Sequence, residues 1–173
     1  MKVNYNHMKT VLLSICLFAI TLGSAGQKAK KLEDLKALYI FNFTKLFNWE
    51  CQSNLKIGVI GNSQVLLSLQ EISKRTNNSF DVIKISQQKS IEDCNIIYIP
   101  SSQSRNLQMI KSTINNSAVL LVSDEVPLLN KGAGIAFNLE GDKLKYYINK
   151  TNLDLSDLAY NSKLLHLGEV IDM

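Results

Sequence analysis

Few side chains of this 173-residue chain are of the types that perform nucleophilic or metal chemistry. Beyond residue 26, the cysteine and histidine residues are Cys51, Cys94 and His166. A catalytic Cys–His pair needs the imidazole beside the thiol, whereas His166 lies between Leu165 and Leu167 in an apolar segment. We therefore expect His166 at a packed or rim position. We expect no catalytic residue, no hydrolase activity and no other enzymatic function.

Metal and nucleotide sites also lack their sequence patterns. A metal ion could recruit only Cys51, Cys94 and His166, and the chain contains no CxxC or HxxxH spacing. The segment Gly58-Val59-Ile60-Gly61 is glycine-bounded like a dinucleotide turn, but GxGxxG and GxxxxGK[ST] are both absent. We expect neither a metal nor a cofactor.

Two short polar segments could still face a small ligand. Gly61, Asn62 and Ser63 form a strand-to-helix turn whose backbone N–H groups could bind an anion. Ser123 and Asp124 follow a strand, and ligands of open α/β sheets bind beyond the carboxyl ends of strands. Capping of the following helix is the alternative at both places, and we favour it over ligand binding.

The elements that would position these residues alternate between strand and helix. Predicted strands cover residues 55–61, 80–85, 95–100 and 118–123, and periodic helices 62–75 and 107–114 lie between them. The run at 95–100 is apolar without interruption, as in strands buried on both faces of a parallel sheet. The alternation predicts right-handed βαβ units on an open sheet.

The pattern changes after Asp124. We expect a short helical turn, then two strands at 135–139 and 143–148, joined by a hairpin turn with Gly141. These strands should be antiparallel and lie at the sheet edge. Helical packing then begins near Leu153, and a last helix, capped by Ser162, should contain Val170.

Residues 1–26 have the layout of a secretory signal. A basic start precedes the apolar run Val11–Leu22, and Ser24–Gly26 supplies small residues for cleavage. The run is shorter than the roughly 20 residues of a membrane-spanning helix, although a retained N-terminal anchor is the alternative. We expect a signal peptide at 1–26 and one exported domain at 27–173.

The charge balance narrows the possible partners. The formal net charge is +4, and removal of the signal takes away Lys2 and Lys9 but no acidic residue. The exported chain is therefore nearly neutral and has no dense cluster of Lys and Arg. We expect no nucleic-acid binding.

A first helix, predicted over residues 31–48, carries an excess of aromatic residues. It presents two adjacent lines of side chains: Leu35, Leu38, Asn42 and Leu46, here called the leucine line, and Tyr39, Phe43 and Phe47, here called the aromatic line. A helix that is apolar on more than one face must be covered on two sides. We predict that the leucine line packs on the sheet. The aromatic line, with Trp49, would then contact a partner or a second copy, and simple core packing is the alternative.

Several segments, in their order along the chain, resemble the YfiR family of small periplasmic proteins. They are Lys36–Trp49, Leu55–Gly61, Asp93–Ile99, Val119–Asp124, Gly132–Ile135, Lys145–Asn149 and Ser162–Leu167. Each motif is short, but the ordered set covers nearly all of the exported chain. One departure is that Glu50 and Cys51 follow Trp49, where the family often has proline.

The resemblance implies a periplasmic signalling regulator with a flavodoxin-like or Rossmann-like fold, in which a mainly parallel open sheet carries an antiparallel edge hairpin. Such a regulator would bind and repress the outer sensor domain of a membrane-bound diguanylate cyclase, and so control cyclic-di-GMP and biofilm formation. A homodimer is the implied state, and a sensor kinase could replace the cyclase. The alternative is an exported domain that binds a small molecule at the carboxyl edge of the sheet.

Cys51 and Cys94 are the cysteines that an exported chain would keep. An oxidising compartment favours a disulfide, and two separate free thiols are the alternative. In a flavodoxin-like order the first and third strands are neighbours, and the two cysteines precede those strands. We therefore predict a disulfide between Cys51 and Cys94, whose redox state could influence partner binding.

Overall fold

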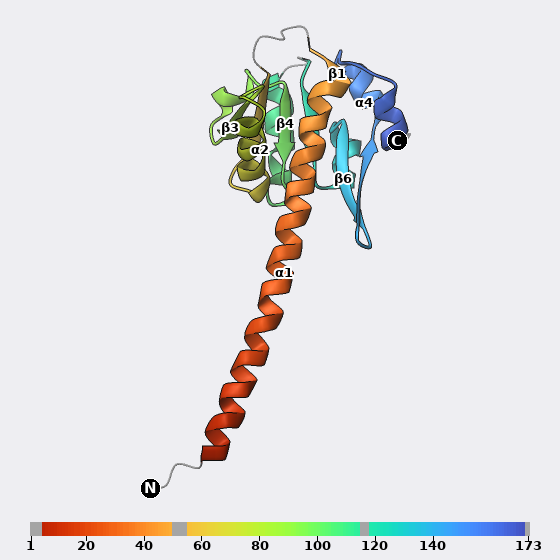
Figure 1. Ribbon diagram of the computed structural model, residues 1–173. Helices are drawn as coiled ribbons and strands as arrows, with labels where there is room; N and C mark the ends of the chain where they lie inside the picture. Colours follow the sequence, from red (N-terminus) through yellow and green to blue (C-terminus); the bar gives the residue numbers. More distant parts are fainter. Residues whose placement is uncertain (1–4, 50–54, 115–117, 172–173) are drawn as a thin grey trace.

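A twisted sheet flanked by helices makes up the body of the protein, and one long helix extends from it (Figure 1). The computed structural model describes residues 5–49, 55–114 and 118–171. The helices are α1 (Tyr5–Leu46), α2 (Gln64–Arg75), α3 (Leu107–Ile114), α4 (Lys150–Leu155) and α5 (Lys163–Leu167), with 3-10 helices η1 (Gln88–Ile91), η2 (Ser101–Asn106) and η3 (Val126–Lys131).

The strands lie where the apolar runs predict them, with short additions near both ends of the domain. They are β1 (Phe47–Asn48), β2 (Lys56–Ile60), β3 (Asp81–Ile85), β4 (Ile96–Ile99), β5 (Leu120–Ser123), β6 (Ile135–Glu140), β7 (Lys143–Ile148), β8 (Ala159–Tyr160) and β9 (Glu169–Val170).

The main sheet of the described residues has the strand order β3-β2-β4-β5-β6-β7-β9. Its first five strands are all parallel and follow the flavodoxin-like order, in which the first strand lies between the second and the third. The hairpin of β6 and β7 is antiparallel, and Gly141 adopts a positive φ of 59° at its turn. The predicted open α/β sheet and its antiparallel hairpin are therefore confirmed.

The end of the chain differs from the prediction. The last helix stops at Leu167, and Val170 belongs to β9, which pairs in parallel with β7 and takes the edge position. Gly168 permits this close approach, since a Cβ there would lie 2.3 Å from Cε2 of Tyr146. Ser162 makes no capping bond; instead the Asn161 side chain accepts from the backbone N–H of Lys163 at 2.9 Å.

The sheet separates two apolar cores. Along β4, Ile96 and Tyr98 face the core beneath α1 and α2, whereas Ile97 and Ile99 face the core that contains α3. This alternation is the two-residue period of a strand, and the burial of all four side chains accounts for the uninterrupted apolar run. Helices α1 and α2 pack side by side on their face of the sheet (Figure 1).

Helix α1 is longer at its start, and shorter at its end, than the predicted 31–48. It spans 42 residues, continues through the predicted cleavage site, and projects beyond the sheet (Figure 1). Its last carbonyls are satisfied from outside the helix, because Trp49 Nε1 donates to Thr44 at 3.0 Å and Asn161 N donates to Leu46 at 2.8 Å. Phe47 and Asn48 therefore leave the helix and pair with β8.

The signal peptide stays a prediction, since the helix itself does not show where the chain is cut. No helix among the described residues has both the length and the apolarity of a membrane span.

Candidate functional site

The leucine line and the aromatic line of α1 have exchanged the environments that the sequence predicts for them. Phe43 is 1% exposed, and Phe47 and Trp49 are also buried, whereas Leu38 is 46% exposed and Leu35 is exposed beside it. The aromatic line therefore packs in the protein's own core, and it is the leucine line that reaches the surface. The predicted partner surface of Tyr39, Phe43, Phe47 and Trp49 is wrong for this fold.

The β6–β7 hairpin explains why the aromatic line turns inward. Phe137 and Tyr146 are directly opposite each other across the hairpin. The ring of Phe43 meets Tyr146 edge-on at 5.2 Å and stacks near Phe137 at 6.3 Å, while Tyr39 meets Tyr146 at 5.5 Å. Such pairs stabilise a core beyond the area that they bury. The signal that sequence analysis missed is the same-face pair Phe137 and Tyr146.

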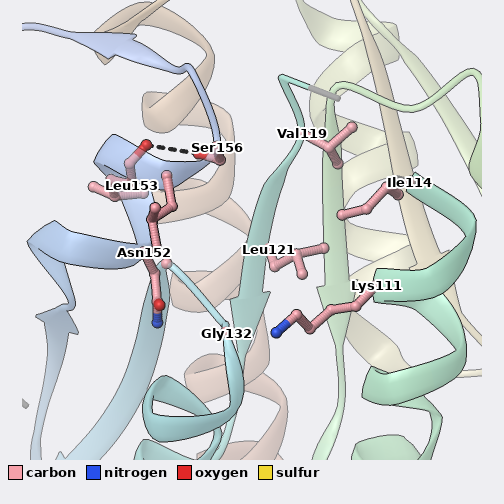
Figure 2. Close-up of a pocket in the computed structure, with 10 residues that line it drawn as sticks. Lys111, Ile114, Val119, Leu121, Gly132, Asn152, Leu153 and Ser156 are labelled. Atoms are coloured by element: carbon pink, nitrogen blue, oxygen red, sulfur yellow. Dashed lines mark hydrogen bonds between the residues drawn. The ribbon is translucent and has the colours of Figure 1, made fainter. Parts of the chain in front are cut away.

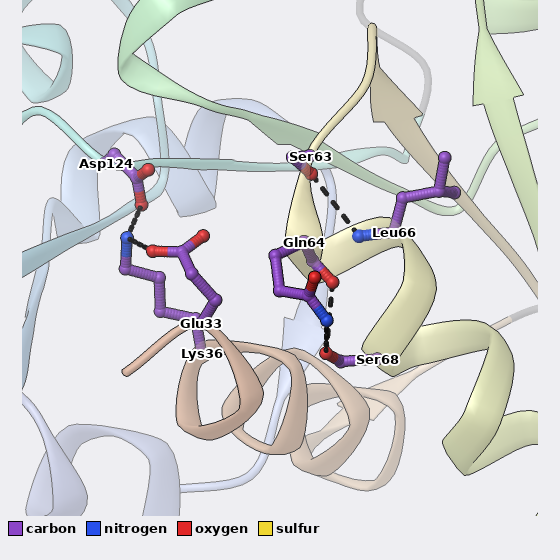
Figure 3. A network of polar contacts seen from close by, with 7 residues as sticks. All are labelled: Glu33, Lys36, Ser63, Gln64, Leu66, Ser68 and Asp124. Carbon is purple, nitrogen blue, oxygen red and sulfur yellow. Dashed lines mark hydrogen bonds and ion pairs between the residues drawn. The ribbon is translucent and has the colours of Figure 1, made fainter. Parts of the chain in front are cut away.

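A nearly buried ionic cluster joins α1 to the carboxyl edge of the sheet (Figure 3). Lys36 is 9% exposed, and its Nζ lies 2.6 Å from Glu33 and 3.1 Å from Oδ1 of Asp124. Asp124 follows β5, so a lysine of the first helix lies where a ligand would enter an open sheet. Ser123 is also buried, and its hydroxyl donates to the Glu125 carbonyl at 3.0 Å.

Tyr98 lies beneath this cluster at the end of β4. Its hydroxyl is buried and makes no hydrogen bond within the described part of the chain. The Oδ1 atom of Asp124 also makes no well-aligned hydrogen bond, although it forms an ion pair with Lys36. Burial first, and the carboxylate of Asp124 second, raise the pKa of Tyr98 far above its ordinary value. Tyr98 is therefore a neutral phenol and not a base.

The Gly61–Ser63 turn is engaged in structure. The Gly61 N–H donates to the Ile85 carbonyl at 3.1 Å, and the Ser63 hydroxyl accepts from the backbone N–H of Leu66 at 3.3 Å (Figure 3). Ser63 is the N-cap residue of α2, which confirms the capping interpretation. Along the predicted ligand edge of Gly61, Asn62, Ser63, Ser123 and Asp124, Ser63 caps α2 and Asp124 pairs with Lys36 of α1. The capping predicted at Ser123 and Asp124 is not found, because η3 begins after Glu125 without a side-chain cap.

Next to this turn, a side-chain hydrogen bond also joins α1 to α2. The Ser68 hydroxyl, on α2, lies 2.5 Å from Asp34 on α1. The same hydroxyl lies 3.0 Å from the Gln64 carbonyl, one turn earlier on its own helix. Together with Lys36, these contacts fix the turn of α1 at residues 33–36 over the sheet edge.

Cys94 is buried at the start of β4. Its thiol donates to the Ser90 carbonyl at 3.3 Å and packs over Gly58 of the neighbouring strand, where a Cβ would come within 2.7 Å of the sulfur. Burial raises the pKa of Cys94 to about 11. Cys94 is a free thiol in this structure, and Cys51 lies outside the described residues. The disulfide therefore stays a prediction, although β2 and β4 are neighbours as it requires.

The remaining candidate residue, His166, is exposed on α5. No group of three His, Cys, Asp or Glu side chains in the described ranges is arranged to hold a metal ion.

Large apolar side chains reach the surface in two further places. Leu155 on α4 and Leu167 on α5 are 69% and 66% exposed, and Val170 on the edge strand β9 is also exposed. We call Leu167 and Val170, which lie on the contacting elements α5 and β9, the C-terminal surface. Elsewhere, Leu139 of the hairpin and Leu67 of α2 are each exposed.

Comparison with known proteins decides the family. A model of the YfiR/HmsC-like family matches residues 33–169, which lie inside the predicted exported domain. The chain belongs to the YfiR/HmsC-like family. This membership confirms the resemblance seen in the short motifs. It supports a periplasmic, regulatory and non-catalytic role in diguanylate cyclase signalling.

Comparison with solved structures shows a shared fold only. A conserved domain protein from Vibrio cholerae O1 biovar El Tor is similar in structure, with a TM-score of 0.59 and 11% sequence identity. The match covers 79% of this YfiR/HmsC-like chain and 60% of the Vibrio chain, so this chain spans less than two-thirds of that protein. No curated protein matches significantly.

Proposed function

We propose that this YfiR/HmsC-like protein is a periplasmic regulator that binds and represses the outer sensor domain of a membrane-bound diguanylate cyclase. The observation that carries the proposal is the family match over residues 33–169, which takes in the main sheet except Val170, the last residue of β9. The geometry agrees with a binding role. The sheet edge where ligands of such folds bind is covered by α1, and large apolar side chains remain exposed elsewhere.

The surface proposed for the sensor is the exposed side of α1 at Leu35 and Leu38. A hollow of about 560 Å³ lies on one flank of this ridge, between α1 and Leu139 of the hairpin. A second hollow of about 420 Å³ lies on the other flank, between α1 and α2. A convex apolar ridge between two hollows is suited to a partner that packs around a helix.

Lysine residues surround this ridge. Lys30 and Lys31 each line one of the two hollows, and neither forms an ion pair within the described residues. A sensor surface that combines apolar and acidic side chains would match it, because charge complementarity sets the orientation and the rate of association. A second copy of the chain would cover the C-terminal surface, which gives the proposed homodimer.

Co-purification from membranes tests the proposal. The tagged, exported protein should retain a membrane protein that has a periplasmic domain and a cyclase domain, and its deletion should raise cellular cyclic-di-GMP. The double variant Leu35→Asp/Leu38→Asp should neither retain the membrane protein nor keep cyclic-di-GMP low. Leu67→Asp on α2 is the matched control, since Leu67 is also an exposed helical leucine, and it should do both.

Each outcome has a distinct meaning. If the unaltered protein retains no cyclase and its deletion leaves cyclic-di-GMP unchanged, the proposed function is wrong. If the protein instead retains a sensor kinase and changes the phosphorylation of that kinase, the regulated enzyme is a kinase and not a cyclase. If the double variant binds and represses normally, the α1 ridge is not the interface. Light scattering of Leu167→Asp, which should be monomeric, tests the dimer separately.

A further inference from the structure

A hollow of about 140 Å³ lies at the amino end of β5 (Figure 2), whereas the ionic cluster lies beyond its carboxyl end. Val119 and Leu121 form one wall, α3 contributes Lys111 and Ile114, and α4 contributes a third side. The helix cap of α2 and the aromatic core lie elsewhere, whereas the exposed Leu155 of α4 lies at the rim of this hollow.

Two glycines let side chains of the hollow pack closely on the backbone. A Cβ at Gly132 would lie 2.4 Å from Nζ of Lys111, and a Cβ at Gly134 would lie 2.5 Å from Cδ2 of Leu153. Gly132 also has a φ of +112°, which residues with a side chain rarely adopt. The side chains of Lys111 and Leu153 therefore already lie directly over these two glycines, and both line the hollow.

The walls are apolar and already ordered. Ile114, Val119, Leu121 and Leu153 are all buried. Asn152 holds the glycine loop in place, because its side-chain amide donates to the carbonyls of Leu129 at 2.6 Å and Ala133 at 2.8 Å. An apolar cavity of about 150 Å³ binds benzene in another protein, so this hollow suits a body of similar size.

One cation reaches over the hollow. Lys111 extends from α3 toward Gly132, and its Nζ donates to the Lys131 carbonyl at 2.9 Å (Figure 2). An ammonium group has three N–H donors, and Lys111 forms no ion pair within the described part of the chain. Two donors therefore face outward beside an apolar wall, which is the arrangement that a carboxylate on an apolar body would satisfy.

We propose that this hollow binds a small monocarboxylate with a compact apolar body, of the size of benzoate or isovalerate. The apolar body would lie against Ile114, Val119 and Leu121, and the carboxylate would pair with Lys111. The hollow is smaller than a typical pocket for a drug-sized ligand, about 300 Å³ or more, which excludes long fatty acids and nucleotides.

Titration of the full chain with benzoate and isovalerate tests the proposal. The backbone amide signals of Gly132 and Gly134 should shift in a saturable manner in ¹H–¹⁵N spectra, with a dissociation constant of about 1 mM or tighter for a ligand of this size. Benzyl alcohol, which keeps the ring but lacks the charge, should bind at least about tenfold more weakly.

Lys111→Met is the decisive variant, because it keeps the length of the side chain and removes the cation. It should weaken benzoate binding by about tenfold or more, whereas Lys163→Met, at an exposed lysine of α5, should not change it. The proposal is overturned if neither acid shifts the glycine signals up to about 10 mM. It is also overturned if Lys111→Met binds benzoate as tightly as the unaltered chain, or if benzyl alcohol binds equally well.

Discussion

The two faces of α1 are built from residues of similar apolarity and have opposite environments. In the aromatic line, Tyr39 and Phe43 lie against the β6–β7 hairpin, and Phe43 and Phe47 are buried. Leu35 and Leu38, by contrast, are in contact with solvent. The difference shows that apolarity alone does not select the core face of a helix. The face that is buried is the one that meets rings of matching geometry, and here the hairpin supplies these in Phe137 and Tyr146.

A similar contrast separates the two lysines of α1 that bind carboxylates across the fold. Lys36 is nearly buried and contacts both Glu33 and Asp124, while the pair of Lys28 with Asp142 is fully exposed at 2.6 Å. Water screens the exposed pair, but a buried charge without its partner is costly. One side of α1 should therefore control stability, and the other should control binding.

The largest effect is expected from removing a ring on the buried face. Phe43→Ala should lower the free energy of unfolding by about 3–5 kcal/mol, because it leaves a cavity among Phe137, Tyr146 and the sheet. Urea denaturation followed by circular dichroism measures it. Leu38→Ala on the exposed face is the matched control, and an equal loss in the two variants would contradict the comparison.

Removing the buried cation should have the next largest effect. Lys36→Met should cost about 3 kcal/mol, since Asp124 would stay buried without a counter-charge. Lys28→Met, which breaks only the exposed pair, should leave the urea midpoint unchanged. If the two variants denature at the same urea concentration, the ionic cluster does not hold α1 to the sheet.

Cys94 should make stability depend on alkaline pH under reducing conditions. Its pKa is raised in the fold from 9.0 to about 11, so between these values the unfolded chain has lost a proton that the folded chain keeps. The stabilising contribution is complete below pH 9 and is lost as pH rises through 11, by about 2 kcal/mol. The difference in urea stability between the unaltered chain and Cys94→Ala should shrink by this amount. A disulfide with Cys51 would remove the dependence.

The smallest stability effect should come from the exposed ridge. Leu38→Asp should change the free energy of unfolding by no more than about 0.5 kcal/mol, because Leu38 is already in contact with water. Its effect should appear only in capture of the sensor. A large loss of stability would mean that Leu38 is packed, and would remove the basis for treating the ridge as an interface.

Much of the fold was predictable because the relevant signals are local. The uninterrupted apolar run at 95–100 identifies a strand buried on both faces, and Gly141 marks the hairpin. Ser63 caps α2 as its position before an apolar period suggests. These features depend on residues within a few positions of each other, so the linear sequence contains them.

The rest depended on contacts between distant residues. Which face of α1 is buried was decided by Phe137 and Tyr146, about a hundred residues later in the chain. Val170 became a strand because Gly168 lets the chain approach β7. The predicted ligand edge was covered because Lys36 reaches Asp124. By itself the sequence determined the strands from β2 to β7, their hairpin and the family. The tertiary structure alone decided which surfaces remain open, because exposure depends on which distant segments pack together.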